Sequence, residues 1–367
     1  MNILILGGTG AMGEPLANML IASNDVWVTS RSERKATHPN LHYIKGNAKQ
    51  KEFLCNVLKY HRWDTVVDFM VRSEQQLKDI LFDVLEATNQ YVFISSARVY
   101  AECDGLITED SPRLLEACMD KEYLKTNEYG LAKAREEDVL RNSGRNNWTI
   151  IRPSITYNDY RLQLGVMEKE DFLYRALHGR TIVFSHDLEN KVTTMTHGND
   201  VARGIAAIIG REEALGETYH ITSPRSLTWG QVLDIYKKVL EEHSGHPIPV
   251  KWTDLTTNFK MEHQFYRIKY CRYFNRSFDN SKIGQFVDVN TFVAPEDGLA
   301  QCLRNFLASP KFGYKNWTLE GVNDRVTGEK TPIKEIQRST DKLWYLAYRY
   351  DLGLMIRLMK KMVKMKK

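Results

Sequence analysis

A tyrosine and a lysine stand four positions apart in the segment Tyr129-Gly-Leu-Ala-Lys133. On an α-helix this spacing puts both side chains on one face, one turn apart. A free tyrosine has a pKa of about 10 and is a poor base near neutral pH, but an adjacent ammonium favours the phenolate and brings proton transfer into range. The pair therefore indicates a general acid/base, with an ordinary exposed helix face as the alternative interpretation.

Two serine hydroxyls follow an apolar run in Tyr91-Val-Phe-Ile-Ser95-Ser96. Such a run predicts a buried strand, and ligands of open α/β sheets bind at the carboxyl ends of the strands. We therefore expect Ser96 to hold an oxygen of the substrate.

Glycines at positions 7, 10 and 13 lie between an apolar strand-like run, Ile3 to Leu6, and a helix-like pattern. Such a turn lets the backbone approach a pyrophosphate, which the N-terminus of the next helix attracts. The alternative is a tight turn without a ligand, and the position after the first strand disfavours it. The residues expected to bind a dinucleotide here are Gly7, Thr9, Gly10, Ala11, Met12 and Gly13.

The second strand ends in Ser30 and Arg31 instead of the acidic residue that would bind a free ribose 2′-hydroxyl. Arg31, with Arg34 close behind, could pair with a 2′-phosphate. The sequence therefore favours NADP(H), with NAD(H) as the alternative, unless both arginines only solvate a surface loop.

These residues require a sheet that brings strand ends together. Apolar runs at 3–6, 26–29, 43–44, 65–69, 91–94 and 148–151 alternate with helix-like segments. This pattern predicts an α/β fold with a doubly wound parallel sheet, a Rossmann domain over residues 1–155. Residues 156–314 are expected to form a smaller C-terminal substrate lobe that partly returns to the sheet, with helices near 171–178, 200–209 and 229–243. Residues 315–367 read as a polar connector, 316–340, and a basic amphipathic helix.

The composition is that of an ordinary globular protein, since 43% of the 367 residues are hydrophobic and 26% are charged. The net charge of +5 is too mild to require nucleic acid. The five cysteines show no metal-ligand or disulfide spacing, so we expect no metal site and a reducing, cytoplasmic location. A secretory signal and a membrane-spanning helix are not expected.

In this order, the glycine turn, Ser95-Ser96-Ala-Arg-Val-Tyr100, Tyr129-x-x-x-Lys133 and Ile151-Arg-Pro153 resemble the extended short-chain dehydrogenase/reductase family of NAD-dependent epimerases and dehydratases. The resemblance covers roughly residues 1–310. It includes Met195-Thr-His197-Gly-Asn-Asp200 and Phe278-Asp-Asn-Ser-Lys-Ile283.

The resemblance implies a nucleotide-sugar epimerase or 4-ketoreductase, an oxidoreductase of the kind used in polysaccharide biosynthesis. Tyr129 would be the general acid/base, Lys133 would bind the nicotinamide ribose, and Ser96 would hold the sugar oxygen. It further implies cofactor contacts from Ser30, Arg31, Asn47, Phe69, Met70, Lys133 and Pro153. The substrate-binding candidates are Ser96, Tyr129, Ser154, Arg161 and His197.

The sequence departs from the family pattern at three places. Phe69 and Met70, after the unusual Asp68, replace a pair of small alanines and would narrow the cofactor path. Asn47 replaces an aspartate near the adenine. Ala97 and Arg98 stand where 4,6-dehydratases carry an Asp-Glu pair, which disfavours dehydration.

Phe69 and Met70 also resemble a divergent branch of the fold, the plastid stem-loop RNA-binding proteins. In that alternative the domain would be a non-catalytic scaffold, and a basic aromatic segment would contact RNA. Its residues are Tyr266, Arg267, Lys269, Tyr270, Arg272, Tyr273, Phe274 and Arg276. The complete Ser96, Tyr129 and Lys133 set favours the enzyme, so we expect neither RNA nor DNA as a partner.

The sequence from Arg357 to Lys367 contains six basic residues and no acidic one. On a helical projection Arg357, Lys360, Lys361 and Lys364 share a face, opposite Met355, Leu358, Met359 and Met362. The pattern is typical of a helix on an anionic membrane surface, so we weigh peripheral membrane contact against a solvated or docked helix.

A homodimer is a further open prediction.

Overall fold

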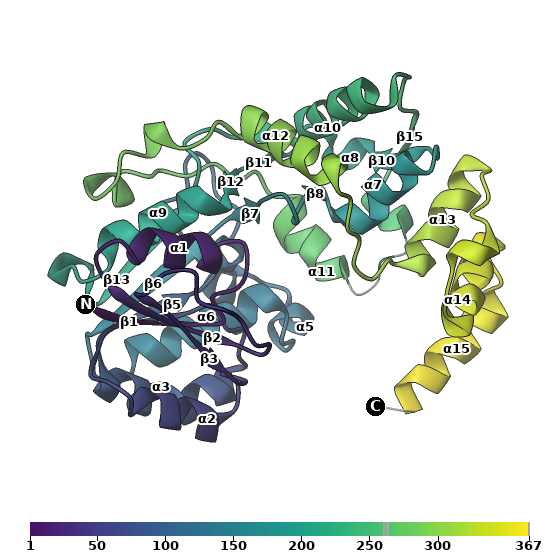
Figure 1. The fold of residues 1–367 in the computed structure, drawn as a ribbon. Coiled ribbons are helices and arrows are strands. Elements are labelled where there is room, and N and C mark those ends of the chain that lie inside the picture. The colour runs from purple at the N-terminus through teal and green to yellow at the C-terminus, as the bar shows by residue number, and fades with distance from the viewer. Residues whose placement is uncertain (260, 262–263, 366–367) are drawn as a thin grey trace. The chain divides into compact units, whose positions relative to one another are not determined.

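The computed structural model describes residues 1–259, 261 and 264–365. The chain divides into two compact units (Figure 1). The first contains residues 1–158, 193–227 and 276–298, and the second contains residues 159–192, 228–275 and 299–367. Among the described residues, no helix combines the length and the apolar character needed to cross a membrane.

A seven-stranded parallel sheet forms the centre of the first unit. Its strands are β1 (Asn2–Leu6), β2 (Asp25–Ser30), β3 (Leu41–Lys45), β4 (Trp63–Asp68), β5 (Thr88–Ile94), β6 (Trp148–Pro153) and β13 (Glu217–Ile221). Their order is β13-β6-β5-β4-β1-β2-β3. The order reverses at β1, where crevices for ligands form in doubly wound sheets. The predicted Rossmann sheet is thus confirmed, and β13 is the part of the later sequence that returns to it.

Helices cover both faces of this sheet, because the side chains of buried parallel strands are apolar on both sides. The helices of the first unit include α1 (Gly13–Leu20), α2 (Lys51–Leu58), α3 (Glu74–Ala87), α4 (Leu114–Ala117), α5 (Lys121–Leu124), α6 (Tyr129–Arg141) and α9 (Gly198–Ile208). α1 and α9 pack on one face against Ile3 and Ile5. α2, α3 and α6 pack on the other face against Leu4 and Leu6. A short pair, β7 (Ile155–Tyr157) and β12 (Met195–His197), extends the unit.

The second unit is mainly helical. Its elements include β8 (Gln163–Leu164), β9 (Met167–Glu168), α7 (Lys169–Leu177), β10 (Ile182–Ser185), α8 (His186–Glu189), α10 (Trp229–Ser244), β15 (Val250–Thr253), α11 (Phe265–Arg267), α13 (Trp317–Thr327), α14 (Ser339–Arg349) and α15 (Gly353–Met365). Three further elements contain residues of both units, namely β11 (Val192–Thr193), β14 (Leu227–Thr228) and α12 (Pro295–Ala308). The helices predicted near 171–178, 200–209 and 229–243 correspond to α7, α9 and α10.

Helix α13 lies in the segment that the sequence predicts to be a polar connector. Glu320, Asn323 and Asp324 of this helix are buried, and the carboxylates of Glu320 and Asp324 lie 3.0 and 2.8 Å from the Arg175 guanidinium of α7. Buried ion pairs thus share the buried side of this helix with Trp317, Leu319 and Val322, so its sequence lacks the continuous apolar face that usually indicates a helix.

Candidate active site

The glycine turn after β1 has the backbone that close approach to a phosphate requires. Gly7 has a φ of +70°, and the Gly7 N–H donates to the Thr29 hydroxyl at 2.9 Å. A Cβ at Gly13 would lie 2.5 Å from the Gly8 Cα, so only glycine lets α1 approach the turn this closely. A Cβ at Gly10 would meet nothing within 4 Å, which leaves open space at the middle of the turn.

The first turn of α1 also fits an anionic group. Its N-cap residue is Met12, and no side chain caps this end of the helix. The first N–H groups of a helix lack partners within the helix and carry its positive dipole end. Gly7, Thr9, Gly10, Ala11, Met12 and Gly13 therefore form a turn that suits a dinucleotide pyrophosphate.

The end of β2 presents a buried hydroxyl followed by an exposed cation. Ser30 is buried, and its hydroxyl accepts the Ser32 N–H at 3.3 Å, whereas Arg31 is exposed. At the end of β3, the Asn47 side chain accepts the Lys49 N–H at 3.1 Å. Arg31 is thus accessible at the strand end where an adenosine ribose binds in such folds.

Met70 occupies space next to the glycine turn. Its Sδ would lie 2.6 Å from a Cβ built on Gly7, so the thioether packs directly on the glycine backbone. The Asp68 carboxylate accepts the Met70 N–H at 2.8 Å and helps to set this loop. Phe69 is half-buried beside it. The departure from a small alanine pair therefore places a large side chain against Gly7.

Asp68 also anchors a buried polar group. It lies 2.9 Å from Arg72 Nε and accepts the Tyr91 hydroxyl at 2.9 Å. Burial raises the pKa of Tyr91 well above its usual value, so Tyr91 stays protonated and donates. The two Nη groups of Arg72 are buried, and none of the residues that the structure describes accepts a hydrogen bond from them.

Tyr129 is the first residue of α6, and Glu128 fixes this helix start. The Glu128 carboxylate accepts the Gly130 N–H at 2.7 Å and the Tyr123 hydroxyl at 3.1 Å. Burial raises the pKa of Tyr123, so this phenol remains a donor. Tyr129 is therefore held at a capped helix terminus.

Arg98 connects Ser96 to Tyr129. The Ser96 hydroxyl accepts the Arg98 N–H at 3.2 Å, and the Arg98 guanidinium lies 5.0 Å from the centre of the Tyr129 ring. The guanidinium also forms an ion pair with Glu128. A Cβ at Gly130 would lie 2.6 Å from the Arg98 carbonyl oxygen, so this glycine permits close packing of α6 on the Ser96 segment. The structure thus links Ser96 and Tyr129 through one residue.

Lys133 lies on α6 one turn after Tyr129 and is buried. Its ammonium lies 2.8 Å from Glu136 Oε2 and 4.5 Å from the centre of the Phe93 ring. Burial raises the pKa of the Glu136 carboxyl, and the charge of Lys133 opposes this effect. The ammonium is therefore held in place by a carboxylate that shares its buried environment.

Ser95 and Ser96 differ in their bonding. The Ser95 hydroxyl is buried and donates to Glu137, which also binds Arg152 through two hydrogen bonds of 2.9 and 2.6 Å. Burial would raise the pKa of Glu137, but Arg152 holds it below the usual value. Ser95 thus belongs to a structural network, whereas Ser96 retains a hydroxyl proton to donate.

The other candidates lie at several places. Pro153 ends β6, and the Ser154 hydroxyl donates to the Thr194 carbonyl at 2.9 Å. His197 is the N-cap of α9, and its neighbour Gly198 lies so close to the Ala11 carbonyl that a Cβ would come within 2.2 Å. His197 is thus beside the glycine turn. Arg161 is exposed and belongs to the second unit.

A match to a protein-family model identifies the family of this chain. The model of the NAD dependent epimerase/dehydratase family matches residues 3–222. The chain belongs to this family. The family membership predicted from the motifs is confirmed.

Solved structures of epimerases and dehydratases share the fold. A dTDP-glucose 4,6-dehydratase from Streptomyces venezuelae, with NAD and TYD bound, is 22% identical with a TM-score of 0.63, covering 84% of this chain and 98% of that chain. A UDP-glucuronic acid 4-epimerase from Bacillus cereus, in complex with UDP-glucuronic acid and NAD, is 18% identical with a TM-score of 0.62, covering 84% and 99%. No curated protein matches the chain.

Within this epimerase/dehydratase fold, sequence reasoning did not assign roles to Thr29, Arg98, Glu128 and Glu136. Each acts on a motif residue through a contact that spacing alone does not reveal. Glu136 offered a signal, since it follows Lys133 by three positions on the same helix. Arg98 was noticed only as a departure from the dehydratase pattern.

Two of the four cations in the basic aromatic segment considered for RNA binding, Arg272 and Arg276, are buried. Arg272 is buried, and its Nε donates to the Gly165 carbonyl at 2.8 Å. Arg276 is buried and donates to the Tyr100 carbonyl at 2.9 Å. Both cations are committed within the protein, which disfavours a phosphate-binding surface built on them.

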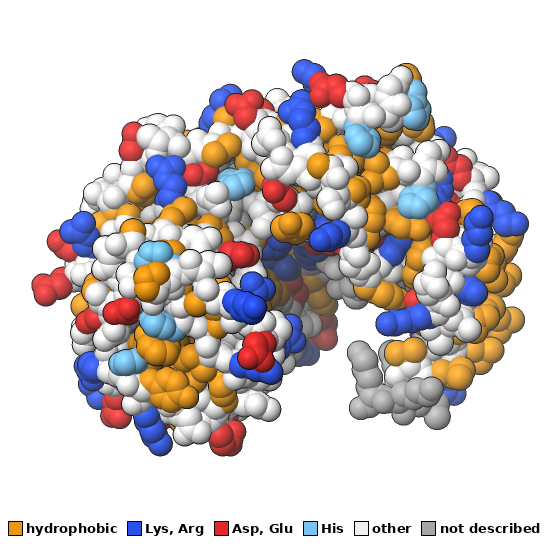
Figure 2. Space-filling view, viewed as in Figure 1, with side chains coloured by type: hydrophobic (Ala, Val, Ile, Leu, Met, Phe, Trp, Pro, Cys, Tyr) orange, Lys and Arg blue, Asp and Glu red, His pale blue; other side chains and the backbone are white. Residues whose placement is uncertain are grey.

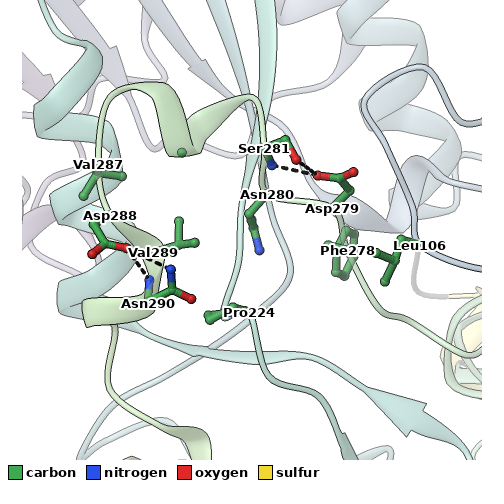
Figure 3. A pocket seen from close by; sticks show the side chains of 11 residues that line it. Leu106, Pro224, Phe278, Asp279, Asn280, Ser281, Val287, Asp288, Val289 and Asn290 are labelled. Carbon is green, nitrogen blue, oxygen red and sulfur yellow. Dashed lines mark hydrogen bonds between the residues drawn. The ribbon is translucent and has the colours of Figure 1, made fainter.

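A separate cavity of about 500 Å³ lies in the first unit, beside the segment that follows β13 (Figure 3). Its lining includes Pro224, Phe278 and Asn280, and none of Ser96, Tyr129 and Lys133. Figure 3 shows the Asn280 amide pointing into the space, while Asp279 and Asp288 bond to neighbouring loop residues. Phe278, Asp279, Asn280 and Ser281, from the segment 278–283 that is part of the family resemblance, thus line this cavity.

Proposed function

We propose that this chain is an NAD(P)-dependent oxidoreductase of a nucleotide-activated sugar, acting as a 4-ketoreductase or an epimerase. The observation that carries the proposal is the link from Ser96 through Arg98 to Tyr129, with Lys133 buried one turn along the same helix. A non-catalytic scaffold would gain nothing from a serine, a tyrosine and a lysine gathered at the carboxyl edge of the sheet.

Each residue has a distinct task. Ser96 donates a hydrogen bond to the sugar oxygen that is being oxidised or reduced, and Tyr129 exchanges a proton with that same oxygen. Lys133 places a positive charge on the face of α6 that carries the phenol, and Glu136 holds this ammonium in position. The Arg98 guanidinium over the Tyr129 ring adds a second cation beside the reacting phenol.

The glycine turn, Ser30, Arg31, Asn47, Phe69, Met70, Lys133 and Pro153 would hold the dinucleotide. When bound, it would supply the hydride-transfer chemistry. The turn fits its pyrophosphate because Gly10 faces open space and α1 lacks a side-chain cap. Met70 against Gly7 makes this site narrower than a pair of alanines would.

Exposed Arg31 supports NADP(H) over NAD(H), since no carboxylate ends β2 and a guanidinium suits a 2′-phosphate. NADPH would serve as an external reductant that each turnover consumes. A preference for NADP(H) therefore favours net reduction of a keto sugar over an epimerisation, which regenerates its own cofactor. Dehydration is disfavoured, because Ala97 is buried and Arg98 is an ion-paired cation where dehydratases need an acid and a base.

The experiment is incubation of the purified protein with a panel of UDP- and dTDP-sugars and their 4-keto derivatives, with NADPH, with NADH or with neither. Loss of the absorbance of the reduced nicotinamide together with a reduced sugar supports the ketoreductase. Conversion of a sugar to its epimer without net loss of the reduced nicotinamide supports the epimerase. No conversion of any member under any condition would contradict the proposal.

A further inference from the structure

Helix α15 is docked on the second unit by only part of its apolar surface. Met355, Ile356 and Met359 pack against a cluster that includes Val322 of α13 and Tyr348 of α14. These contacts place one face of α15 inward. The helical projection of the sequence placed Met355, Met359, Leu358 and Met362 on one face. In the structure Met355 and Met359 pack inward, whereas Leu358 and Met362 are exposed to solvent.

A second apolar strip on α15 faces solvent. Leu354, Leu358 and Met362 follow one another at four-residue steps and are 76%, 61% and 60% exposed. Together with α14 and the turn before α15, the exposed large apolar side chains are Leu343, Tyr350, Leu352, Leu354, Leu358, Met362 and Val363. Elsewhere among the described residues, no stretch as long as 343–363 exposes more than two large apolar side chains. Exposed apolar strips of this kind mark interaction surfaces.

A basic strip runs along the same helix beside the apolar one. Arg357 and Lys361 are exposed and lie three positions after Leu354 and Leu358, on the neighbouring line of the helix. Lys360 is half-buried next to them, and the sequence from Gly353 onward contains no acidic residue. Figure 2 shows apolar and basic side chains together over this part of the second unit.

We propose that the solvent-facing side of α15 binds the surface of an anionic lipid bilayer. Leu354, Leu358 and Met362 would enter the boundary between headgroups and acyl chains, while Arg357 and Lys361 would contact the lipid phosphates. A second copy of this chain is a poorer occupant, because pairing two α15 helices would bring like charges together. RNA is a poorer occupant too, since it has no use for a strip of aliphatic side chains.

The experiment is cosedimentation of the full chain with vesicles of phosphatidylcholine alone or mixed with phosphatidylserine. The protein is expected to bind the mixed vesicles and not the neutral ones, and added salt is expected to weaken the binding. Deleting α14 and α15 is unsuitable as a test, because α14 packs on α13 and the loss of α14 would disturb the second unit.

Point substitutions separate the two strips. Arg357→Ala with Lys361→Ala should weaken vesicle binding roughly 25-fold, since each cation near an anionic surface contributes about fivefold. Leu354→Ser with Leu358→Ser should weaken it about tenfold or more. The matched control is Lys49→Ala with Lys59→Ala, two exposed lysines of the first unit, which should leave binding unchanged.

Thermal melts of each variant establish that the folded state is retained. Absence of binding by the parent chain, or binding by both α15 variants at the parent level, would overturn the proposal. A parent dimer that dissociates in the leucine variant, with no vesicle binding, would assign the strip to a second copy and overturn it as well. These results do not depend on whether the proposed sugar chemistry is correct.

Discussion

The ammonium of Lys133 lies 2.8 Å from the carboxylate of Glu136, and both side chains are at most 2% exposed. The ion pair joins the lysine of the tyrosine-lysine motif to a residue that the motif does not include. In a buried pair, each charge depends on the other, because water cannot replace a missing partner. The position of Lys133 near Tyr129 therefore depends on Glu136.

Glu136→Gln is expected to destabilise the fold by about 3 kcal/mol, because it leaves the buried ammonium without its counter-charge. Urea unfolding measures this free energy. The double variant Lys133→Met with Glu136→Leu should lose less than the two single changes added together, since it removes both charges. The control is Glu122→Gln, which breaks the exposed pair with Lys125 of the same spacing and should cost below about 1 kcal/mol. Equal losses for Glu136→Gln and Glu122→Gln would contradict a structural role of the buried pair.

Gly10→Ala should leave stability nearly unchanged, because its Cβ meets nothing within 4 Å. It should nevertheless raise the Kd of NAD(P)H about tenfold, since the methyl group would occupy the space expected for the pyrophosphate. Calorimetric titration measures the Kd. Gly7→Ala is the contrasting variant, because the φ of +70° and the Met70 thioether both oppose a side chain there. It should lose roughly 1–2 kcal/mol of stability from the backbone strain alone. Unchanged cofactor affinity in Gly10→Ala would argue against a dinucleotide at this turn.

Arg31→Ala should weaken NADPH binding about tenfold and leave NADH binding unchanged, because only NADPH carries the 2′-phosphate that the guanidinium would contact. The same titration gives both affinities. Arg211→Ala, another exposed arginine of the first unit, is the control and should alter neither. If Arg31→Ala weakens NADH and NADPH equally, the residue does not select the cofactor.

Asp171 predicts an unusual pH dependence for the second unit. Burial raises the pKa of this carboxyl to about 6, above its ordinary value of 3.8. The folded state therefore holds a proton that the unfolded state has lost between about pH 4 and pH 6, so this group's contribution to stability falls as the pH rises through that range. The loss should reach about 2–3 kcal/mol.

Asp171→Asn should remove this loss. The free energy of unfolding of the variant, relative to that of the parent, should therefore be higher at pH 8 than at pH 4. Urea unfolding at both pH values measures it. Asp234→Asn on α10, an exposed aspartate of the same unit, should show no such difference. A parent-minus-variant difference that stays constant across the range would mean that folding does not raise the pKa of Asp171.

The sheet was predictable because its strands are continuous apolar runs and the glycine turn marks the first crossover. The positions of Ser96 after β5 and of Tyr129 and Lys133 on α6 were predictable for the same reason, since their spacing follows the elements that carry them. Arg98 was not recognised, because its contact with Tyr129 is made only after α6 packs on the Ser96 segment. The role of Glu136 was missed because its three-residue spacing from Lys133 does not show that the pair is buried. Helix α13 was missed because ion pairs with Arg175, distant in sequence, hold its buried face.

The interleaved composition of the two units also lay beyond the sequence pattern. The chain leaves the first unit after Asn158 and returns to it at Thr193 and again at Arg276. The first return depends on pairing with distant strands, as β13 pairs with β6 and β12 pairs with β7, and in the second return Phe278 forms a bridge with Ile107. Periodicity within one segment carries no information about such long-range partners.

The most direct measurement for the central claim is turnover of the converted nucleotide sugar by the parent protein, by Tyr129→Phe and by Tyr60→Phe. Tyr129→Phe is expected to lose about 100-fold or more in kcat while still binding NAD(P)H, because the phenol that exchanges the proton is gone. Tyr60→Phe, an exposed tyrosine of the first unit, should retain parental turnover. A Tyr129→Phe variant as active as the parent would contradict the account.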